Sequence, residues 1–185
     1  CTVSAVISNR AGVRGLERAR EAGIPAEVLD HKAFASREDF DAELARRIDA
    51  HAPDLVILAG FMRILTPGFV RHYAGRLLNI HPSLLPRYPG LHTHQRALEA
   101  GDTEHGATVH FVSEDLDGGP AIVQARVQVL PGDTPETLAA RVLQHEHLIY
   151  PLAARLYAEG RLRLQGERAE LDGSPLPVHG MPLDA

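Results

Sequence analysis

The sequence has little cysteine, no long apolar run and no cluster of basic residues. Its single cysteine, Cys1, excludes an internal disulfide framework and a cysteine-based zinc site. No apolar stretch approaches the roughly 20 residues that span a bilayer, and no basic start leads into an apolar segment of the secretory type. We therefore expect a cytoplasmic protein with no membrane partner.

The charged residues are interleaved rather than grouped by sign. The chain carries a net charge of -5, whereas a groove for nucleic acid needs clustered lysine and arginine. With 185 residues, of which 44% are hydrophobic and 23% charged, the chain suits one globular domain that spans residues 1–185. We expect small-molecule substrates, no nucleic-acid partner, and a monomer or homodimer.

Eleven histidines raise the question of a metal site. The segments 92–94 and 145–147 each place two histidines two residues apart, but no third ligand group has the spacing that completes a metal motif. We therefore expect no metal.

Hydrophobic periodicity predicts an α/β fold with a mostly parallel, twisted sheet and helices on both faces. Ser36 is a plausible N-cap for a helix on which Phe40, Leu44 and Ile48 share one face, and Thr134 begins a long helix that Pro151 should bend or end. The other expected helices cover residues 15–22, 67 onwards and 94–100. The expected strands cover residues 2–8, 26–29, 54–60, 76–80, 107–112 and 121–130, followed by a hairpin at 162–164 and 169–171 and then coil.

The apolar character of residues 54–60 predicts a central parallel strand covered on both faces. Residues 107–112 and 121–130 are expected to form an antiparallel extension of the sheet. No internal repeat or interdomain linker interrupts this pattern.

A polar pair ends the strand at 76–80. Asn79 and His81 alternate with Ile80, so an extended chain points both side chains to one side. Prolines follow at once, and strand ends of this kind are where α/β sheets bind ligands. Asp117 stands beside Gly118 and Gly119, where the backbone can approach a ligand closely. Asn79, His81 and Asp117 form a credible acid-base set, although the first two could instead cap a strand end and Asp117 could be a turn residue.

Three motifs carry a resemblance to a known family. Asn79-Ile-His-Pro-Ser-Leu-Leu-Pro86, Tyr88-Pro-Gly-Leu-His-Thr-His94 and Leu116-Asp-Gly-Gly-Pro120 resemble those of the phosphoribosylglycinamide formyltransferases, folate-dependent enzymes of purine synthesis. The resemblance covers nearly the whole chain and implies a Rossmann-like formyltransferase fold.

The resemblance implies transfer of a formyl group from the cosubstrate 10-formyltetrahydrofolate to the amine of glycinamide ribonucleotide. An amine that attacks a formamide-like carbon creates a negative oxygen, which requires fixed hydrogen-bond donors and a route for a proton. Asn79 and His81 can donate to that oxygen, and Asp117 can favour a charged imidazole and relay the proton through water.

The resemblance also implies binding residues, some of which could equally be ordinary core or surface residues. For the folate these are Arg37, Met62, Arg63, Ile64, Leu65, Leu77, Val112, Ser113, Glu114, Asp115 and Leu116. For the nucleotide they are Gln144, His145 and Glu146, of which Glu146 matches the carboxylate that binds the ribose hydroxyls. Leu143 departs from the polar residue usual in the family.

The start of the chain departs from the family pattern. Members begin with a strand and a glycine-rich loop whose backbone amides hold the substrate phosphate. The given sequence opens at what resembles the second strand of the family, so about two dozen residues, the size of a strand-loop-helix unit, are expected to be missing from it.

Three alternative functions remain open at this stage. Related enzymes hydrolyse 10-formyltetrahydrofolate or formylate another amine, but a hydrolase is expected to carry a regulatory domain and a transfer-RNA formyltransferase a basic C-terminal one. The third alternative is a catalytically silent folate-binding protein, if the chain truly lacks the phosphate loop.

Overall fold

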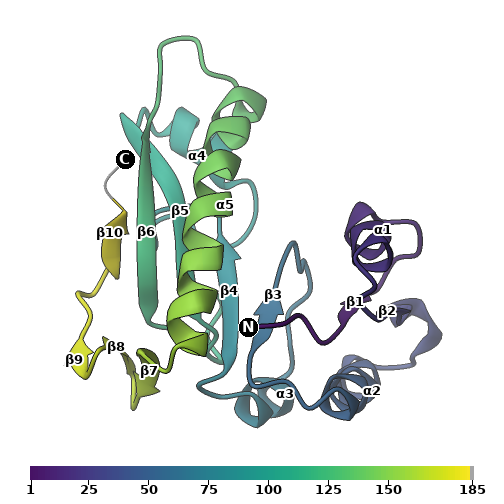
Figure 1. Ribbon diagram of the computed structural model, residues 1–185. Helices are drawn as coiled ribbons and strands as arrows, with labels where there is room; N and C mark the ends of the chain where they lie inside the picture. Colours follow the sequence, from purple (N-terminus) through teal and green to yellow (C-terminus); the bar gives the residue numbers. More distant parts are fainter. Residues whose placement is uncertain (184–185) are drawn as a thin grey trace. The chain divides into compact units, whose positions relative to one another are not determined.

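The computed structural model describes residues 1–183, which fall into two compact units. The first unit comprises Cys1–Asp54 and Arg63–His72, and the second comprises Leu55–Met62 and Tyr73–Ala185. Both units combine helices with strands, so the predicted α/β class is confirmed (Figure 1). The expectation of a single domain remains a prediction.

The first unit contains a two-stranded parallel sheet and helices. Strand β1 pairs with β2 from Val6 opposite Ala26 to Ser8 opposite Val28, and α1 packs against both strands. Its elements are β1 (Val6–Ser8), α1 (Arg14–Glu21), β2 (Ala26–Val28), a short 3-10 helix (His31–Ala33), α2 (Arg37–Ala50) and α3 (Pro67–His72).

Helix α2 begins where the sequence predicts. The Ser36 hydroxyl accepts a hydrogen bond from the backbone N–H of Asp39 at 3.0 Å, which satisfies one of the open donors of the first turn. Phe40 and Leu44 are buried on one face, as their spacing of four residues indicates. Asp41 is buried on the same helix and accepts from the backbone N–H of Thr66 at 2.7 Å, which holds the start of α3 against α2.

The second unit is built on a five-stranded sheet of mixed direction. Its strand order is β10-β6-β5-β4-β3, in which β4 pairs parallel with β3 and antiparallel with β5, and β6 pairs antiparallel with β5. The predicted antiparallel extension is therefore confirmed. The elements are β3 (Val56–Leu58), β4 (Leu77–His81), α4 (Thr93–Glu99), β5 (Glu104–Phe111), β6 (Ala121–Gln128), α5 (Pro135–Ala158), β7 (Leu162–Gln165), β8 (Arg168–Leu171), β9 (Ser174–Pro175) and β10 (Met181–Leu183).

The prediction of a central, doubly covered strand at 54–60 was wrong for the described sheet. Strand β3 lies at its edge, and Ile57 is 44% exposed. An apolar run indicates that a strand can be buried, but it does not say how many strands flank it.

Helix α5 lies across β5 and β6, which Figure 1 shows. The Thr134 hydroxyl accepts from the N–H of Thr137, and the Thr137 hydroxyl in turn accepts from the N–H of Thr134, so the helix starts with a reciprocal cap. The helix continues through Pro151 to Ala158, so of the two outcomes expected at this proline, a bend or an end, the end was wrong. Burial of its apolar face, which includes Ile149 and Ala153, offsets the hydrogen bond that proline removes.

Among residues 1–183 no helix is both long enough and apolar enough to cross a membrane.

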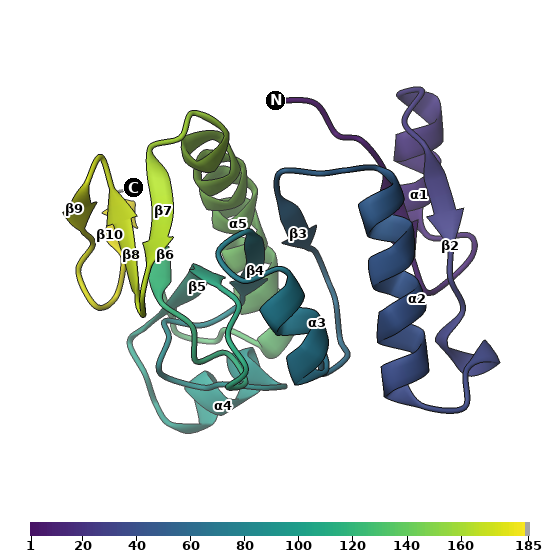
Figure 2. The same ribbon diagram turned by 90° about the horizontal axis from the view of Figure 1, so that it is seen from below.

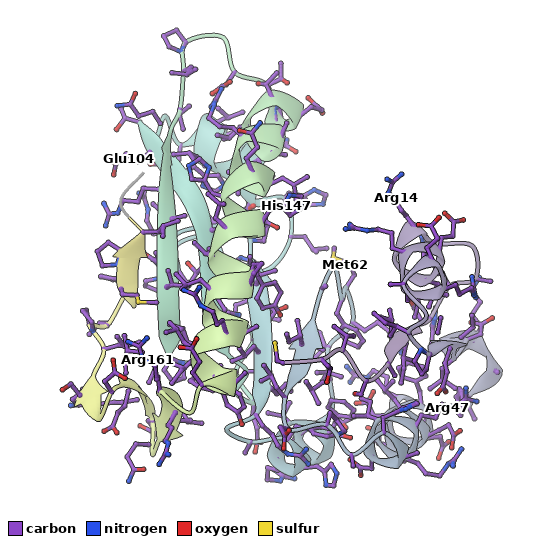
Figure 3. All side chains as sticks on the ribbon, in the orientation of Figure 1. Arg14, Arg47, Met62, Glu104, His147 and Arg161 are labelled. Atoms are coloured by element: carbon purple, nitrogen blue, oxygen red, sulfur yellow. The ribbon has the colours of Figure 1, made fainter. Side chains whose placement is uncertain are left out.

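The predicted C-terminal hairpin is confirmed as β7 and β8, and β7 adjoins the end of α5 (Figures 1 and 2). Arg161, labelled in Figure 3 where α5 gives way to the hairpin, binds Asp172 across its base at 2.7 Å. The coil expected after the hairpin was wrong in part. Residues 181–183 form β10, which pairs parallel with β6 and includes Pro182. An edge strand tolerates a proline, so composition alone could not distinguish it from coil.

Buried polar side chains connect β5 and β6 to the chain that follows β4. The Thr108 hydroxyl donates to the carbonyl oxygen of Ser83 at 2.7 Å and accepts from the N–H of Leu85 and from the amide of Gln124. In the described part of the chain, every buried side-chain nitrogen and oxygen has a hydrogen-bond partner. These bonds make the interior of the second unit partly polar.

Buried histidines make the stability of the protein depend on pH. Burial lowers the pKa of His105 from 6.5 to about 4, and it also lowers the pKa of His94, whose ring nitrogen Nδ1 lies 3.1 Å from Nε2 of His105. In the unfolded chain, histidine takes up its proton near pH 6.5. Between pH 6.5 and 4 the unfolded state therefore binds more protons, and stability falls as pH falls.

We predict that, as the pH falls from 6.5 to 4, the shifted pKa of His105 alone lowers the free energy of unfolding by roughly 2 to 3 kcal/mol. Urea unfolding between pH 8 and pH 4 measures the slope, and His105→Gln should flatten it. His179→Gln, at an exposed position, is the control and should leave the slope unchanged. Equal slopes in wild type and His105→Gln would contradict the prediction.

Candidate active site

The predicted polar pair, Asn79 and His81, lies on strand β4 of the second unit. Asn79 lies opposite Leu58 of β3 and opposite His110 of β5, and His81 lies opposite Thr108. Alternate residues of a strand point to the same side, so Asn79 and His81 project together.

His81 is 6% exposed and contacts other groups through both ring nitrogens. Its Nε2 lies 2.8 Å from the carbonyl oxygen of Tyr88, and its Nδ1 lies 3.5 Å from Oδ2 of Asp117. A carbonyl oxygen only accepts hydrogen bonds, so Nε2 must carry a proton. Nδ1, which faces the carboxylate, is then the nitrogen that can gain or lose one.

The conformation of its own backbone and a hydrogen bond from the backbone of a second loop fix the position of Asp117. Its φ of +52° lies in the left-handed region, and its Oδ2 accepts a hydrogen bond from the N–H of Gly90 at 2.8 Å. A Cβ atom on Gly119 would lie 1.8 Å from the carbonyl oxygen of Phe111. Glycine is therefore required at 119 because two backbone segments of this protein meet there, whereas the sequence suggested close approach to a ligand.

Sequence reasoning missed His110, which the structure places beside the predicted residues. Its Nε2 lies 3.2 Å from Nδ2 of Asn79 and 4.0 Å from Oδ1 of Asp117, and its Nδ1 lies 2.9 Å from the carbonyl oxygen of Phe111. Burial lowers the pKa of His110, so the ring is neutral near pH 7. Because Nδ1–H donates to Phe111, the bare Nε2 accepts from the amide of Asn79.

This contact fixes the orientation of the Asn79 amide. One N–H of the amide is used by His110, and the second can serve another acceptor. The available signal was that His110 lies in a predicted strand of the same sheet as Asn79. The sequence did not give the register that sets the two residues opposite each other.

The predicted nucleotide-binding residues lie on α5. Gln144 is exposed, and Nδ1 of His145 lies 3.1 Å from the carbonyl oxygen of Arg141. Glu146 is half-buried, and this burial raises the pKa of its carboxyl group against the opposing effect of His147, which Figure 3 labels on the same helix. Leu143, the departure from the family pattern, is 47% exposed.

Tyr150 anchors this part of α5 to strands β3 and β4. Its hydroxyl lies 2.6 Å from the carbonyl oxygen of Leu58 and 3.0 Å from that of Leu78. Tyr150 follows Glu146 by four residues, so both lie on one face of the helix. The helix therefore presents Glu146 on the face that is fixed to β3 and β4.

Of the predicted folate-binding residues in the second unit, most lie on the loop after β5. Val112 donates from its backbone N–H to the carbonyl oxygen of Leu77 at 3.0 Å, and Leu116 is 59% exposed. Ser113, Glu114 and Asp115 lie between them. Met62 is 75% exposed after β3, where Figure 3 labels it, whereas Leu77 is 1% exposed and belongs to the core.

The remaining predicted folate-binding residues belong to the first unit. Arg37 begins α2 and is exposed. The guanidinium of Arg63 lies over the ring of Phe40, 4.9 Å from its centre, and Ile64 and Leu65 follow it in the segment that precedes α3. The structure thus unites Asn79, His81 and Asp117 within the second unit, and it unites Arg63 with α2 within the first.

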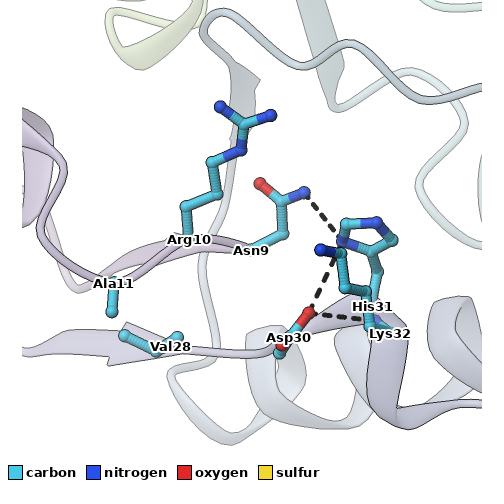
Figure 4. Close-up of a pocket in the computed structure, with 7 residues that line it drawn as sticks. All are labelled: Asn9, Arg10, Ala11, Val28, Asp30, His31 and Lys32. Atoms are coloured by element: carbon cyan, nitrogen blue, oxygen red, sulfur yellow. Dashed lines mark hydrogen bonds and ion pairs between the residues drawn. The ribbon is translucent and has the colours of Figure 1, made fainter.

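A separate hollow of about 510 Å³ lies in the first unit where β1 and β2 end, and Figure 4 shows its lining residues. The amide of Asn9 contacts the ring of His31 at 3.1 Å, and Asp30 accepts from the N–H of Lys32. No predicted site residue lines this hollow. Within residues 1–183, no group of three or more histidine, cysteine or acidic residues has the arrangement of a metal site.

Comparison with known proteins identifies the family of the chain. Residues 1–154 match the family model described as formyl transferase. The chain is 60% identical over 183 residues to phosphoribosylglycinamide formyltransferase of Escherichia coli K12, and the match covers 99% of this chain and 86% of the relative. It is 47% identical over 169 residues to the human trifunctional purine biosynthetic protein adenosine-3, with coverage of 91% of this chain and 17% of that protein.

Solved structures give the same result. A phosphoribosylglycinamide formyltransferase from Coxiella burnetii has a TM-score of 0.94 and 52% identity, over 99% of this chain and 86% of that one. The family match extends over more than half of the chain, and the identity is high over almost all of it. The chain therefore belongs to the formyl transferase family.

Proposed function

We propose that the protein transfers a formyl group from 10-formyltetrahydrofolate to the primary amine of glycinamide ribonucleotide. The observation that carries the proposal is the arrangement of Asn79, His81, His110 and Asp117 around the end of β4. The names of close relatives at 60% and 49% identity support the same substrate.

The amine nitrogen forms a bond to the formyl carbon, and the carbonyl oxygen becomes negatively charged. The second N–H of Asn79 is the donor for this oxygen, and a protonated His81, whose Nδ1–H faces Asp117, places a positive charge beside it. Asn79 is fixed by His110, and His81 is fixed by Tyr88, so neither side chain has to reorganise during the reaction. The bond between the formyl carbon and the folate nitrogen then breaks.

The transfer also moves one proton. The amine loses a proton when it becomes an amide, and the departing folate nitrogen gains one. Asp117 faces Nδ1 of His81 and can accept a proton, so it can pass the proton through water from the amine nitrogen to the folate nitrogen.

The remaining residues have binding roles in the proposal. The carboxylate of Glu146 accepts hydrogen bonds from the ribose hydroxyls, with Gln144 and His145 beside it. The backbone of residues 112–116 and the exposed Met62 and Leu116 form one part of the folate site, because a flat heteroaromatic ring binds apolar surfaces edged by backbone groups. For Arg37 and residues 63–65, which belong to the first unit, folate binding stays a prediction.

We predict formyl transfer that depends on the amine substrate. The assay mixes 10-formyltetrahydrofolate and glycinamide ribonucleotide with the protein and measures the transfer as a change in folate absorbance. The control omits the nucleotide. Product in that control would instead favour hydrolysis of the folate, and folate binding without turnover would favour a silent binding protein.

Substitution of Asn79 by alanine should lower kcat by about 100-fold to 1000-fold, because it removes the oxyanion donor. Asn9→Ala is the matched control, since Asn9 also contacts a histidine ring but lies in the first unit. Steady-state kinetics measure kcat for both variants, and equal losses of kcat would exclude a specific role for Asn79.

Substitution of Asp117 by asparagine should leave folate binding intact and lower turnover by at least about 100-fold. The new amide oxygen can still accept from Gly90, so the loop is retained while the charge and the proton acceptor are lost. Asp172→Asn is a close control because Asp172 has the same φ of +52° and lies at the hairpin. Wild-type turnover in Asp117→Asn would refute the assignment.

A further inference from the structure

The loop between β4 and α4, residues 82–92, contacts both members of the His81–Asp117 pair through its backbone. The carbonyl oxygen of Tyr88 accepts from Nε2 of His81 at 2.8 Å, and two residues later the N–H of Gly90 donates to Oδ2 of Asp117 at 2.8 Å. We call residues 82–92 the proline loop. We propose that Tyr88, anchored by Asp102, is a positioning residue for the His81–Asp117 pair; this role rests on the proposed function.

The backbone of Tyr88 adopts a conformation that its residue type disfavours. Its φ is +54°, in the left-handed region, where a bulky side chain is uncommon. Tyr88 also precedes Pro89, and the residue before a proline is normally extended. A conformation of this kind persists only where surrounding contacts impose it. Here the conformation is the one in which the carbonyl of Tyr88 meets His81.

The side chain of Tyr88 supplies the contacts that hold the backbone. Its hydroxyl donates to Oδ2 of Asp102 at 2.7 Å, and this hydrogen bond, with burial, raises the pKa of the phenol. The other carboxylate oxygen of Asp102 accepts from Nη2 of Arg87 at 2.5 Å. The guanidinium groups of Arg87 and Arg96 lie 5.4 Å and 5.2 Å from the centre of the Tyr88 ring, and the edge of the ring meets His105.

Other contacts fix the two sides of the proline loop. Arg96 donates to the carbonyl oxygen of Pro89 at 2.6 Å and to that of Leu91 at 3.3 Å. Near the start of the loop, the Ser83 hydroxyl donates to the carbonyl oxygen of Arg87 at 2.6 Å. Tyr88 lies between these supports, so the phenol-to-carboxylate bond is the contact that sets the direction of its carbonyl.

This arrangement gives the proline loop a chemical role beyond support. The Tyr88 carbonyl keeps the proton on Nε2 of His81, so that proton exchange takes place at Nδ1, and Gly90 holds the carboxylate that faces Nδ1. If the carbonyl turned away, Nε2 would lose its acceptor and the neutral ring could carry its proton on either nitrogen. The anchor therefore selects the tautomer as well as the position of the ring.

Tyr88→Phe tests the proposal because it keeps the ring and removes only the hydroxyl. We expect kcat to fall about 10-fold, with KM for both substrates changed less than about 2-fold, because no contact with a substrate is removed. Tyr157→Phe, at the far end of α5 beside the β7 hairpin, is the matched control and should retain wild-type kcat. Wild-type kcat in Tyr88→Phe, or a rise in KM alone, would overturn the proposal.

A double-mutant cycle distinguishes positioning from a general loss of stability. Asp102→Asn keeps an oxygen that can accept from the phenol, so it should retain more activity than Asp102→Ala. In the Tyr88→Phe background the two substitutions at 102 should differ by less, since the hydrogen bond from the phenol is already absent and only the contact with Arg87 distinguishes them. Additive losses across the cycle would overturn the proposal.

A measurement that does not depend on activity separates this inference from the proposed function. The ¹⁵N chemical shifts of His81 report which ring nitrogen carries the proton near neutral pH. We expect a proton held on Nε2 in the wild type and a mixture of tautomers in Tyr88→Phe. Unchanged shifts in the variant would refute the positioning role, whereas absence of formyl transfer by the wild type with the expected shifts would refute only the proposed reaction.

Discussion

The antiparallel pairing of β4 with β5 is the constraint on which the candidate site depends. It sets His110 opposite Asn79 and Thr108 opposite His81, so each polar residue of β4 has a polar neighbour on β5. A register shift of one residue would turn the side chains of β5 to the other face of the sheet. Asn79 would then lose its contact with His110, and Thr108 would no longer hold the chain that follows His81.

The two histidines of this site have different hydrogen-bond partners. His110 donates to a carbonyl and accepts from an amide, so it is satisfied as a neutral ring and burial lowers its pKa. His81 has a carbonyl on one side and a carboxylate on the other, both of which favour donors. The same residue type is therefore a fixed neutral acceptor at 110, whereas the proposed function gives it the role of a proton carrier at 81.

Much of the local structure followed from the sequence because short-range chemistry determines it. The Ser36 cap, the two long strands β5 and β6, and the alternation of Asn79 with His81 depend only on neighbours in the chain. The predictions failed where distant packing decides. Pro151 did not end α5, because the buried face of the helix outweighs the missing bond.

The same limit applies to the candidate site. The motif around Asn79 and His81 and the loop of Asp117 could be found in the sequence, and their close approach within the second unit is what the structure adds. His110 could not be found, because its role is created by strand register. The part played by Tyr88 likewise depends on Asp102, which is 14 residues away in the sequence.

The close approach of Gly119 to Phe111 also affects how Asp117 can move. Phe111 ends β5 and donates its N–H to the carbonyl oxygen of Pro120, so the loop that carries Asp117 is joined to the strand that carries His110. A surface loop alone can rearrange within nanoseconds to microseconds, whereas opening of a strand ladder is a form of local unfolding and is slower. We therefore expect the carboxylate and the buried imidazole to move together rather than independently, because the loop of Asp117 is tied to the end of the strand that carries His110.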